Sequence, residues 1–463
     1  MKKKTKKNIL FIIPDSTSVR NYAYSNIISE FNNDVNIHIW STLDQKVIQK
    51  IESLHNVKIF YNKILLPKEN FFKFFLREIT TYARLVHNSK KIKNETIKRF
   101  WKHNNNTFKK AIFYKVSKLF GQCISYSYRM ILLIENFFNK LVTHKDISFF
   151  KKKLVQDKID TIFITHQRVA QLYPIVLAAK KIKINVISSI YSWDNMPKAR
   201  LNIFAEKYLV WSDHMKNEFK IYYPEIHPDK IIVSGTPQFD FYNDKSKIIE
   251  RDIFAKKYNL DVKKKWILYS GCDSLTSPYD QFYLSDLAEA IYNNGNKYEI
   301  IFRRCPADFS DRFDKVIKKY FNLISVIDPI IEKSDSWVDS IPDPEDCTLL
   351  VNVVFHCEIA VNVGSSIAHD FSNFNKPTIY IDYDIYLNNN WSIKIINAYQ
   401  HFRSMPSNNC VVFLKDRKDW FHLVDKVVNN PMEFATDRLL WYKKINKTQN
   451  NYNSKKIANI LMK

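Results

Sequence analysis

The chain has 463 residues, too many for one ordinary hydrophobic core and about enough for two α/β domains with an insertion. Hydrophobic residues make up 46% of the sequence and aromatic residues 15%, which excludes an intrinsically disordered protein. The 71 Lys and Arg against 47 Asp and Glu give a formal charge of +24, so an anionic partner is expected, although an AT-rich genome would explain part of the lysine excess.

The cysteines and the apolar runs indicate where the protein works. The six cysteines form no CxxC pair, which favours a reducing compartment and offers no zinc or iron–sulfur spacing. In the basic start MKKKTKKNILFIIPDS, the apolar run Ile9–Ile13 is too short for a secretory leader and predicts a first strand. No stretch reaches the ~18 apolar residues that cross a bilayer. We therefore expect a cytoplasmic protein whose membrane contact is peripheral.

Short β-rich runs alternate with amphipathic stretches along the chain, the pattern of parallel sheets covered by helices. In the first half the predicted strands are Ile9–Ile13, Val35–Trp40, Val57–Phe60, Thr161–Thr165, Asn185–Ser189, Tyr208–Trp211 and Ile231–Ser234. In the second half they are Trp266–Ser270, Glu299–Arg303, Ile324–Ile327, Glu358–Asn362, Thr378–Ile381 and Val411–Leu414.

A polar stretch separates the two series, which predicts an α/β fold of two Rossmann-like domains. We expect an N-terminal domain over 1–240, a linker over 241–261, a second domain over 262–430 and a helical tail over 431–463. Ligands of open α/β sheets bind beyond the carboxyl ends of the strands, so the cleft between the domains is the expected site.

Residues 66–153 do not fit a doubly wound sheet and predict a helical insertion in the first domain. Apolar residues recur there at helical spacing in two series, Phe72, Leu76, Ile79, Ala83 and Val86, and then Ile112, Val116 and Leu119. Residues 61–160 hold 22 Lys and Arg against 7 Asp and Glu, an excess of 15 positive charges. Such a segment suits an anionic membrane surface. It equally suits a packed helical pair with a solvated basic face. Nucleic-acid binding is a weaker third option, since no recognition module is found.

Three residues that follow strands of the first half are candidates for the base that activates an acceptor hydroxyl. Asp194, in the segment SWDN, is the first choice, and Asp15 and His166 are further candidates. Asp194 equally suits a loop residue that forms hydrogen bonds. Trp193, Asn195 and Arg168 are the residues expected on the acceptor side.

The segment IFRRCPAD, residues 301–308, ends a predicted strand with two arginines. The guanidinium groups of Arg303 and Arg304 suit phosphate oxygens, and the alternative is an ordinary strand-end ion pair. Gly271 and Ser274, after an earlier strand, are further candidates for binding the donor.

The segment EIAVNVGSSIAHDFSNFNKPTIYI, which starts at residue 358, reads as strand, small-residue turn, helix and strand. Gly364, Ser365 and Ser366 stand where the helix begins, so free backbone N–H groups there can bind a diphosphate. Asp370, one turn further, can accept hydrogen bonds from ribose hydroxyls. Taken alone, the two serines are also a good helix cap and Asp370 a solvated residue.

These segments, in this order, resemble GT-B glycosyltransferases, in particular transferases of bacterial capsule, surface carbohydrate and teichoic acid. In that family an acidic residue stands seven positions before a Pro, as Asp370 stands before Pro377. IFRRCPAD is similar to a motif with an Arg before a His-Pro pair, although Cys305 replaces the His. SWDN and the turn GTPQFD are similar to the end of the family's N-terminal domain. The resemblance spans about residues 161–382 and implies the GT-B fold.

The resemblance also implies the reaction. We expect transfer of a sugar from a nucleotide-sugar donor to a lipid-linked or growing glycan acceptor in surface-polysaccharide synthesis, at the inner face of the cytoplasmic membrane. No metal or cofactor is expected to take part, because arginines and a helix terminus can stabilise the leaving diphosphate. No nucleic-acid partner is expected either, since no recognition module is found. A retaining enzyme would need no base, and Asp194 would then position the substrate.

Three alternatives stay open. A CDP-polyol phosphotransferase of teichoic-acid type shares the fold, although Cys305 counts against it. A sugar-nucleotide 2-epimerase has the same two domains, and a non-enzymatic basic scaffold for acidic polymer would bind no nucleotide. Nucleotide hydrolysis, metalloprotease and esterase chemistry lack their motifs, since the sequence has no GxxxxGK[ST], HExxH or GxSxG.

Overall fold

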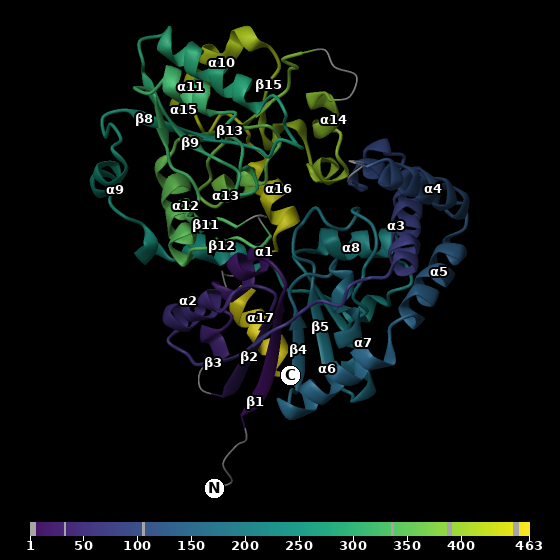
Figure 1. Ribbon diagram of the computed structural model, residues 1–463. Coiled ribbons are helices and arrows are strands. Elements are labelled where there is room, and N and C mark those ends of the chain that lie inside the picture. Colours follow the sequence, from purple (N-terminus) through teal and green to yellow (C-terminus); the bar gives the residue numbers. More distant parts are fainter. Residues whose placement is uncertain (1–5, 32–33, 104–106, 335–337, 387–390, 448–452) are drawn as a thin grey trace. The chain divides into compact units, whose positions relative to one another are not determined.

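The computed structural model describes residues 6–31, 34–103, 107–334, 338–386, 391–447 and 453–463. The chain divides into two compact units (Figure 1). Unit 1 comprises Met1–Pro237, Tyr399–His401 and Ile445–Lys463, and unit 2 comprises Gln238–Ala398 and Phe402–Lys444. Each unit contains a parallel sheet with helices packed against it, so the predicted pair of Rossmann-like domains is confirmed.

The sheet of unit 1 has seven strands in the order β3-β2-β1-β4-β5-β6-β7, all paired in parallel. Its strands form where apolar runs are buried on both faces; Ile9–Ile13, for example, are at most 1% exposed. The strands are β1 (Lys7–Ile13), β2 (Val35–Ser41), β3 (Ile59–Lys63), β4 (Thr161–Ile164), β5 (Asn185–Ser189), β6 (Lys207–Val210) and β7 (Ile231–Val233).

Helices pack against this sheet, and one of them comes from a distant part of the chain. The helices outside the insertion are α1 (Ser16–Ser18), α2 (Gln45–His55), α7 (Tyr173–Lys181), α8 (Asp213–Tyr222) and α17 (Asn453–Met462). Helix α17 contacts β1 and β4, and its residues Ile457, Ala458 and Leu461 are at most 1% exposed. The predicted tail 431–463 is therefore shared by the two units, since residues from Ile445 onward belong to unit 1.

The sheet of unit 2 has six parallel strands in the order β10-β9-β8-β13-β14-β15. They are β8 (Lys265–Ser270), β9 (Tyr298–Arg303), β10 (Ile324–Val326), β13 (Ile359–Asn362), β14 (Thr378–Ile381) and β15 (Val412–Leu414). The accompanying helices are α9 (Arg251–Tyr258), α10 (Asp280–Tyr292), α11 (Asp314–Lys319), α12 (Pro344–His356), α13 (Ile367–Ser372), α14 (Ile393–Asn397), α15 (Trp420–Asn429) and α16 (Arg438–Ile445).

Two features of unit 2 were not predicted. A two-stranded antiparallel ladder pairs β11 (Ile331–Glu332) with β12 (Ile341–Pro342). The stretch 241–261, predicted as a linker, contains the helix α9 and belongs to unit 2. Both elements are short, and neither has the long apolar run that marks the other strands.

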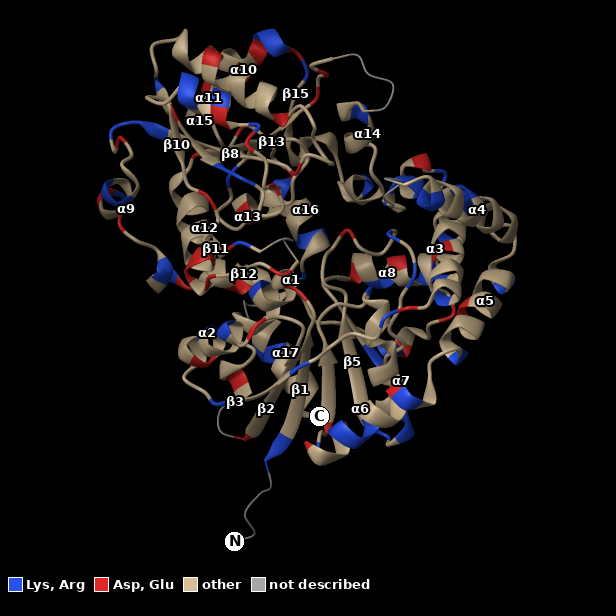
Figure 2. Ribbon diagram, in the orientation of Figure 1, with Lys and Arg blue, Asp and Glu red and all other residues tan. Residues whose placement is uncertain are grey.

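The insertion is helical, as predicted. It consists of α3 (Phe71–Ile92), the short helix η3 (Glu95–Phe100), α4 (Phe108–Ile124), α5 (Tyr128–Lys140) and α6 (His144–Gln156). Helix α3 packs closely on α4 at Gly121, where a Cβ atom would lie 2.9 Å from the carbonyl oxygen of Ile79. Figure 2 shows Lys and Arg distributed over these helices.

A buried ion-pair network fixes the insertion to the rest of unit 1. The Arg84 guanidinium on α3 donates to Glu135 on α5 at 2.6 and 2.7 Å and to Glu225 at 2.8 Å. The side chains of Arg84 and Glu135 are both 2% exposed. Burial alone would lower the pKa of Arg84, but the two carboxylates raise it well above its ordinary value. Removal of one partner would leave a buried charge uncompensated, so this network ties α3 and α5 to the segment after α8.

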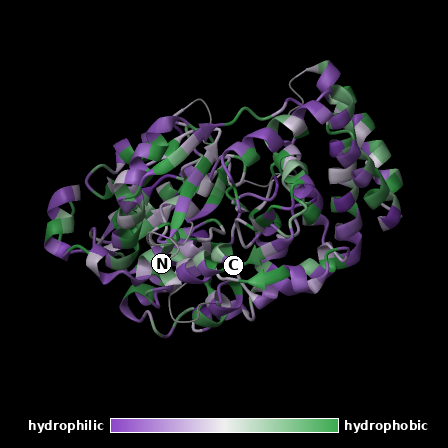
Figure 3. Cartoon of the chain, turned by 90° about the horizontal axis from the view of Figure 1, so that it is seen from below, coloured by the Kyte–Doolittle hydropathy of each residue, from purple (hydrophilic) through white to green (hydrophobic). Residues whose placement is uncertain are grey.

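The two apolar series of the insertion have different environments. On α3, Ile79, Ala83 and Val86 are at most 5% exposed and form part of the core. On α4, apolar residues recur every three or four positions along one face but lie open to solvent: Phe108 81%, Ile112 47%, Val116 37% and Leu119 65% exposed. In Figure 3 the insertion helices, at the right edge, show hydrophobic and hydrophilic residues side by side. The residues that the structure describes include no helix long and apolar enough to cross a membrane.

Candidate functional site

In the sheet of unit 1 the strand order reverses between β1 and β4. The chain runs outward from β1 to β3 and returns to β4 on the other side of β1, which is the position where open α/β sheets bind ligands. Asp15 follows β1 and His166 follows β4, so the topology places both residues at this point. Their side chains meet: Nδ1 of His166 lies 2.5 Å from Oδ2 of Asp15.

Asp15 is held in place by its own helix. It caps the N-terminus of α1, where Oδ1 accepts the backbone N–H of Ser18 at 2.8 Å. Burial acts to raise the pKa of Asp15, but hydrogen bonds from His166 and Ser18 and the charge of His166 outweigh it, so this pKa lies below its ordinary value. Asp15 is therefore an anion that fixes the His166 ring and favours a proton on Nδ1.

The other nitrogen of His166 is the chemically important one. Nε2 is buried and has no hydrogen-bond partner among the described residues, while the side chain as a whole is 17% exposed. The ring lies against Tyr191, with ring centroids 4.1 Å apart. A buried nitrogen without a partner costs free energy, which a ligand hydroxyl at Nε2 would recover. The pair thus has the geometry of a general base with an orienting carboxylate.

Asp194, the first choice from the sequence, has its carboxylate occupied by neighbours. Oδ1 accepts hydrogen bonds from Ser192 at 2.6 Å and Asn195 at 3.0 Å, and Oδ2 forms an ion pair with Lys198. Burial acts to raise the pKa of Asp194, yet the charges of Lys198 and His401 lower it far below its ordinary value. A carboxylate with so low a pKa is a weak base, so this geometry fits the alternative of a loop residue that forms hydrogen bonds.

The residues expected on the acceptor side lie near Asp194. Asn195 is buried, and its Oδ1 lies 3.5 Å from Nη1 of Arg168. Trp193 is 6% exposed and meets His401 edge-to-face, with ring centroids 5.0 Å apart. Asn195 and Arg168 are therefore brought together, while Trp193 is mainly a packing residue.

In the sheet of unit 2 the strand order reverses between β8 and β13, as it does between β1 and β4 in unit 1. The loop after β8 begins with Gly271 and Cys272, and Sγ of Cys272 contacts the Val363 carbonyl at 3.4 Å, at the turn after β13. Gly364 in that turn has φ +61°, and a Cβ there would lie 3.1 Å from Phe402. Glycine suits this position best, because a side chain would be strained at this φ and crowded against Phe402. Ser274, further along the first loop, is exposed.

The start of helix α13 offers a weaker anion site than the sequence suggested. The helix has only six residues, so its dipole is small. Two of the expected N–H donors are used within the turn: that of Ser365 bonds to Oδ1 of Asn362 at 2.7 Å, and that of Ile367 to Oγ of Ser365 at 3.3 Å. Ser366 begins the helix without a side-chain capping bond. The turn can contribute to a diphosphate site but does not form one alone.

Asp370 lies in α13, and its Oδ1 accepts a hydrogen bond from the Tyr242 hydroxyl at 2.7 Å. Two residues that line a pocket of 410 Å³ also contact the Gly364–Ser365 turn: Tyr380 donates to the Ser365 carbonyl at 2.6 Å, and Phe402 packs at Gly364. Phe413 and Arg403 also line it. Aromatic walls and a guanidinium suit a nucleotide.

Arg303 is a structural residue. Its Nη2 lies 2.7 and 2.9 Å from the two carboxylate oxygens of Asp346 on α12, and Nη1 donates to the Ile327 carbonyl at 3.3 Å. The side chains of this pair are 8% and 5% exposed. The donor role predicted for Arg303 is not supported by this geometry, because both Nη atoms are bound to protein oxygens in a buried place.

Arg304 is more accessible but also paired. Its Nη2 lies 2.9 Å from Asp314 and its Nε 3.1 Å from Asp328, with the side chain 18% exposed. The neighbouring Cys305 is a neutral thiol, since burial raises its pKa to about 12. A neutral thiol cannot replace the charged hydrogen bond that a histidine would give to phosphate.

Two residues at the carboxyl edge of unit 2 were not found from the sequence. Oδ2 of Asp280 accepts the Cys272 N–H at 2.7 Å and Oδ1 accepts the Tyr269 hydroxyl at 2.8 Å; burial raises the pKa of Asp280 to about 6. Arg312 binds the carbonyl oxygens of Cys272 and Ser277. Together they hold the loop after β8. The position of Asp280 at a helix start was the only available signal.

The described residues hold no group of three His, Cys, Asp or Glu side chains placed to bind a metal ion. The expectation of a metal-independent reaction thus stays a prediction. If phosphate charge is neutralised by the protein alone, Arg304, Arg403 and the turn after β13 are the candidate groups in unit 2.

Two parallel sheets, in each of which the strand order reverses once, define a GT-B fold. Among solved structures, the chain is similar to the UDP-GlcNAc 2-epimerase of Methanocaldococcus jannaschii, with a TM-score of 0.53 and 12% identity over 98% of this chain and 99% of that one. It is also similar to S. aureus MnaA in its co-structure with UDP, with a TM-score of 0.52 and 10% identity over 98% and 95%. No family model matches the sequence, and no curated protein matches it. At this identity the likeness shows the fold alone.

Proposed function

We propose that the protein is a glycosyltransferase that moves a sugar from a nucleotide sugar to a lipid-linked or growing glycan acceptor of a bacterial surface polysaccharide. The observation that carries the proposal is the pair of Asp15 and His166, with Nε2 of His166 buried and unpartnered among the described residues. Nε2 would take the proton of the acceptor hydroxyl as its oxygen attacks the anomeric carbon. The bond from that carbon to the diphosphate breaks, and the diphosphate leaves with the electron pair.

Unit 2 would hold the donor. It contains the Gly364 turn and a 410 Å³ pocket lined by aromatic side chains and Arg403, and two of these aromatic residues, Tyr380 and Phe402, contact the turn. Asp370, next to the Tyr242 hydroxyl, would accept a hydrogen bond from a ribose hydroxyl. Donor binding and proton transfer would then be provided by different units, so each can be tested by its own variants.

The alternatives from the sequence differ in support. A CDP-polyol phosphotransferase is disfavoured by Cys305, because a neutral thiol cannot bind phosphate as a histidine does. A sugar-nucleotide 2-epimerase has the same fold and would also need groups that move protons. The exposed apolar and basic surface of the insertion favours the transferase, because a lipid-linked acceptor has to be met at a membrane and a soluble nucleotide sugar does not.

We further propose that the insertion holds the protein on an anionic membrane. Phe108, Ile112, Val116 and Leu119 form an exposed apolar stripe on α4. Lysines are abundant in the same segment, and near an acidic leaflet each contributes about 1 kcal/mol. The combination is that of an interfacial helix.

The proposal is tested in two steps with the full chain. A thermal-shift screen against UDP, CDP, GDP, CMP and their sugar conjugates identifies the donor, because a ligand that binds the folded state raises the melting temperature. Turnover with that donor is then measured by NMR for wild type, His166→Ala and Asp15→Asn. We expect turnover to fall by roughly 10²–10⁴-fold in His166→Ala, while nucleotide affinity stays unchanged.

Two results would contradict the transferase. Equal turnover in His166→Ala and wild type would exclude His166 as the base. Inversion at C2 of the donor sugar without transfer to any acceptor would instead assign an epimerase.

A further inference from the structure

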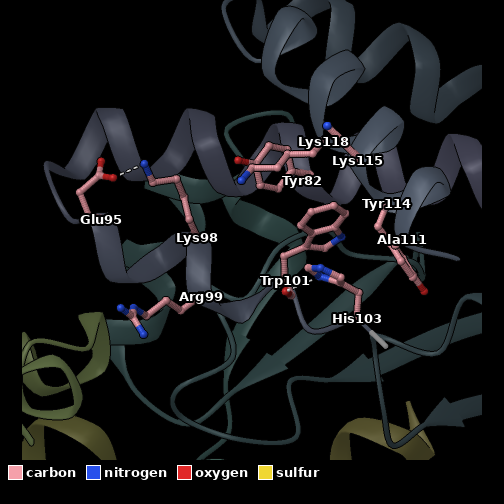
Figure 4. Close-up of a pocket in the computed structure, with 10 residues that line it drawn as sticks. All are labelled: Tyr82, Glu95, Lys98, Arg99, Trp101, His103, Ala111, Tyr114, Lys115 and Lys118. Atoms are coloured by element: carbon pink, nitrogen blue, oxygen red, sulfur yellow. Dashed lines mark hydrogen bonds and ion pairs between the residues drawn. The ribbon is translucent and has the colours of Figure 1, made fainter. Parts of the chain in front are cut away.

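A second pocket, of 640 Å³, lies within the insertion, and none of its lining residues belongs to the sites described above. It lies among α3, η3 and α4, and all of its lining residues belong to unit 1. Figure 4 shows Trp101 near the centre of this pocket, with Tyr82, His103 and Tyr114 around it. Neither the proposed base nor the proposed donor site uses any of these residues.

One wall of the pocket is aromatic and rigid. The Trp101 ring centroid lies 4.5 Å from that of Tyr82, 4.4 Å from His103 and 5.8 Å from Tyr114. The indole is held in place because its Nε1–H donates to Oε2 of Glu78 at 2.9 Å. Trp101 is only 8% exposed and supports the half-buried Tyr114 ring. Flat aromatic faces bind the C–H faces of pyranose rings, and a ring held in place does so without losing conformational entropy.

The rest of the lining is positively charged. Four basic residues line the pocket against one acidic residue, Glu95, which forms an ion pair with Lys98. Lys115 and Lys118 are exposed and make no ion pair with the residues that the structure describes. With Ala111 and Tyr114 they follow the spacing of one helix face, so α4 presents both ammonium groups to the same pocket as the Tyr114 ring.

We propose that this pocket binds a glycosyl phosphate, with the sugar ring on Tyr114, which Trp101 holds in place, and the phosphate on Lys115 and Lys118. The proposal rests on the proposed function and deepens it, because a lipid-linked acceptor carries a phosphate between its sugar and its lipid. Helix α4 also carries the exposed apolar stripe that begins at Phe108. A glycosyl phosphate bound here would therefore have its lipid beside the surface proposed to meet the membrane.

The test uses the full chain with its nucleotide site saturated, so that only binding outside the donor site is measured. Saturation-transfer NMR and calorimetry compare glucose 1-phosphate, glucose and inorganic phosphate. The variants are Lys115→Ala/Lys118→Ala, Tyr114→Leu and the control Lys109→Ala/Lys110→Ala, which removes the same charge from α4 at residues that do not line the pocket.

We expect glucose 1-phosphate to bind more tightly than either of its parts. The Lys115→Ala/Lys118→Ala variant should weaken it by about 10-fold or more, and the control should stay within about twofold of wild type. Tyr114→Leu should weaken glucose 1-phosphate but leave inorganic phosphate unchanged, since only the sugar uses the ring. If farnesyl-phosphoglucose in detergent binds more tightly than glucose 1-phosphate, the natural ligand is a lipid headgroup. If the two bind equally, the natural ligand is a soluble sugar phosphate.

Three results would overturn the proposal. One is a wild-type protein that binds its nucleotide but not glucose 1-phosphate. Another is glucose 1-phosphate binding that ignores Lys115→Ala/Lys118→Ala. The third is a single-stranded RNA that binds through the same lysines more tightly than any sugar phosphate. A failure of the proposed glycosyltransferase function would give a different result, namely a protein that binds glucose 1-phosphate but no nucleotide.

Discussion

Asp370 is the single residue whose replacement tests the donor site most directly. Its carboxylate is partly exposed and bonds to the Tyr242 hydroxyl, so removal should leave the fold intact. If Asp370 accepts a hydrogen bond from a ribose hydroxyl, Asp370→Ala should weaken nucleotide binding by about 1.5–3 kcal/mol, measured by calorimetry. Glu358→Ala is a matched control, since Glu358 precedes β13 and lies at the opposite edge of the sheet. Equal affinity in Asp370→Ala and wild type would remove Asp370 from the site.

A second prediction at this scale concerns His401 and pH. Burial lowers the pKa of His401 to about 4, with Lys198 lowering it further and Asp194 opposing the shift. An imidazole in the unfolded chain titrates near 6.5. Between these values the unfolded chain binds a proton that the folded chain does not, so the free energy of unfolding should fall as the pH falls from about 6.5 to 4.

His401→Gln removes this contribution. The free energy of unfolding in urea, measured at pH 7.5 and pH 5, should therefore drop less in the variant than in wild type. The same drop in both proteins would show that other groups account for the acid sensitivity.

Sequence alone identified the three candidate bases, and we propose a different order of preference from their contacts in the structure. Asp15 and His166 were candidates because each follows a strand, and the sheet topology brings them together. The preference for Asp194 did not take account of Lys198, four residues further in the same loop, because a loop has no fixed spacing from which an ion pair can be predicted. The contact of Asp370 with Tyr242 spans 128 residues and was beyond any local pattern.

At the scale of elements, helix α4 gives the prediction for the membrane. Phe108 and Leu119 are 81% and 65% exposed on one face of this helix. Phe108→Ser/Leu119→Ser should reduce co-sedimentation with anionic liposomes by about 10-fold or more, because each buried apolar side chain contributes about 1.5–3 kcal/mol. Binding should also weaken as salt is raised.

The matched control is Phe321→Ser, which removes a side chain 71% exposed in unit 2. Charge reversal at Lys90 or Lys91 is less suitable, because Lys90 lies over the Tyr126 ring and Lys91 donates to the Ile221 carbonyl. Liposome binding that ignores lipid charge and the α4 variant would refute the membrane role.

The positions of helices and strands were easier to predict than which of their faces would be buried. Each predicted strand is present within three residues of its expected ends, because central parallel strands are continuous apolar runs bounded by polar turns. The spacing of Ile112, Val116 and Leu119 predicted a helix but did not indicate which side the apolar face would occupy. Periodicity shows that apolar residues share a face, whereas exposure depends on what the rest of the chain places against it.

For the whole molecule, the prediction concerns helix α17. It packs on β1 and β4 of unit 1, and Asn453 donates to the Thr236 carbonyl at 3.1 Å. Deletion of residues 453–463 uncovers Ile457 and Leu461, each worth about 1.5–3 kcal/mol when buried. We expect unit 1 to become sensitive to limited proteolysis while unit 2 stays protected. The control is Lys455→Ala/Lys456→Ala, because both lysines are exposed on the same helix. Equal protease resistance of both units after the deletion would contradict the prediction.

The placement of α17 also affects how the chain folds while it is being made. Residues 453–463 follow all of unit 2 in sequence, so a ribosome has synthesised unit 2 before it releases the helix that covers β1 and β4. Domains generally complete their folding in the order of synthesis, but here the first sheet must wait with apolar surface uncovered until the second unit has emerged. The protein should therefore depend on chaperones during translation more than a chain whose two domains are each continuous.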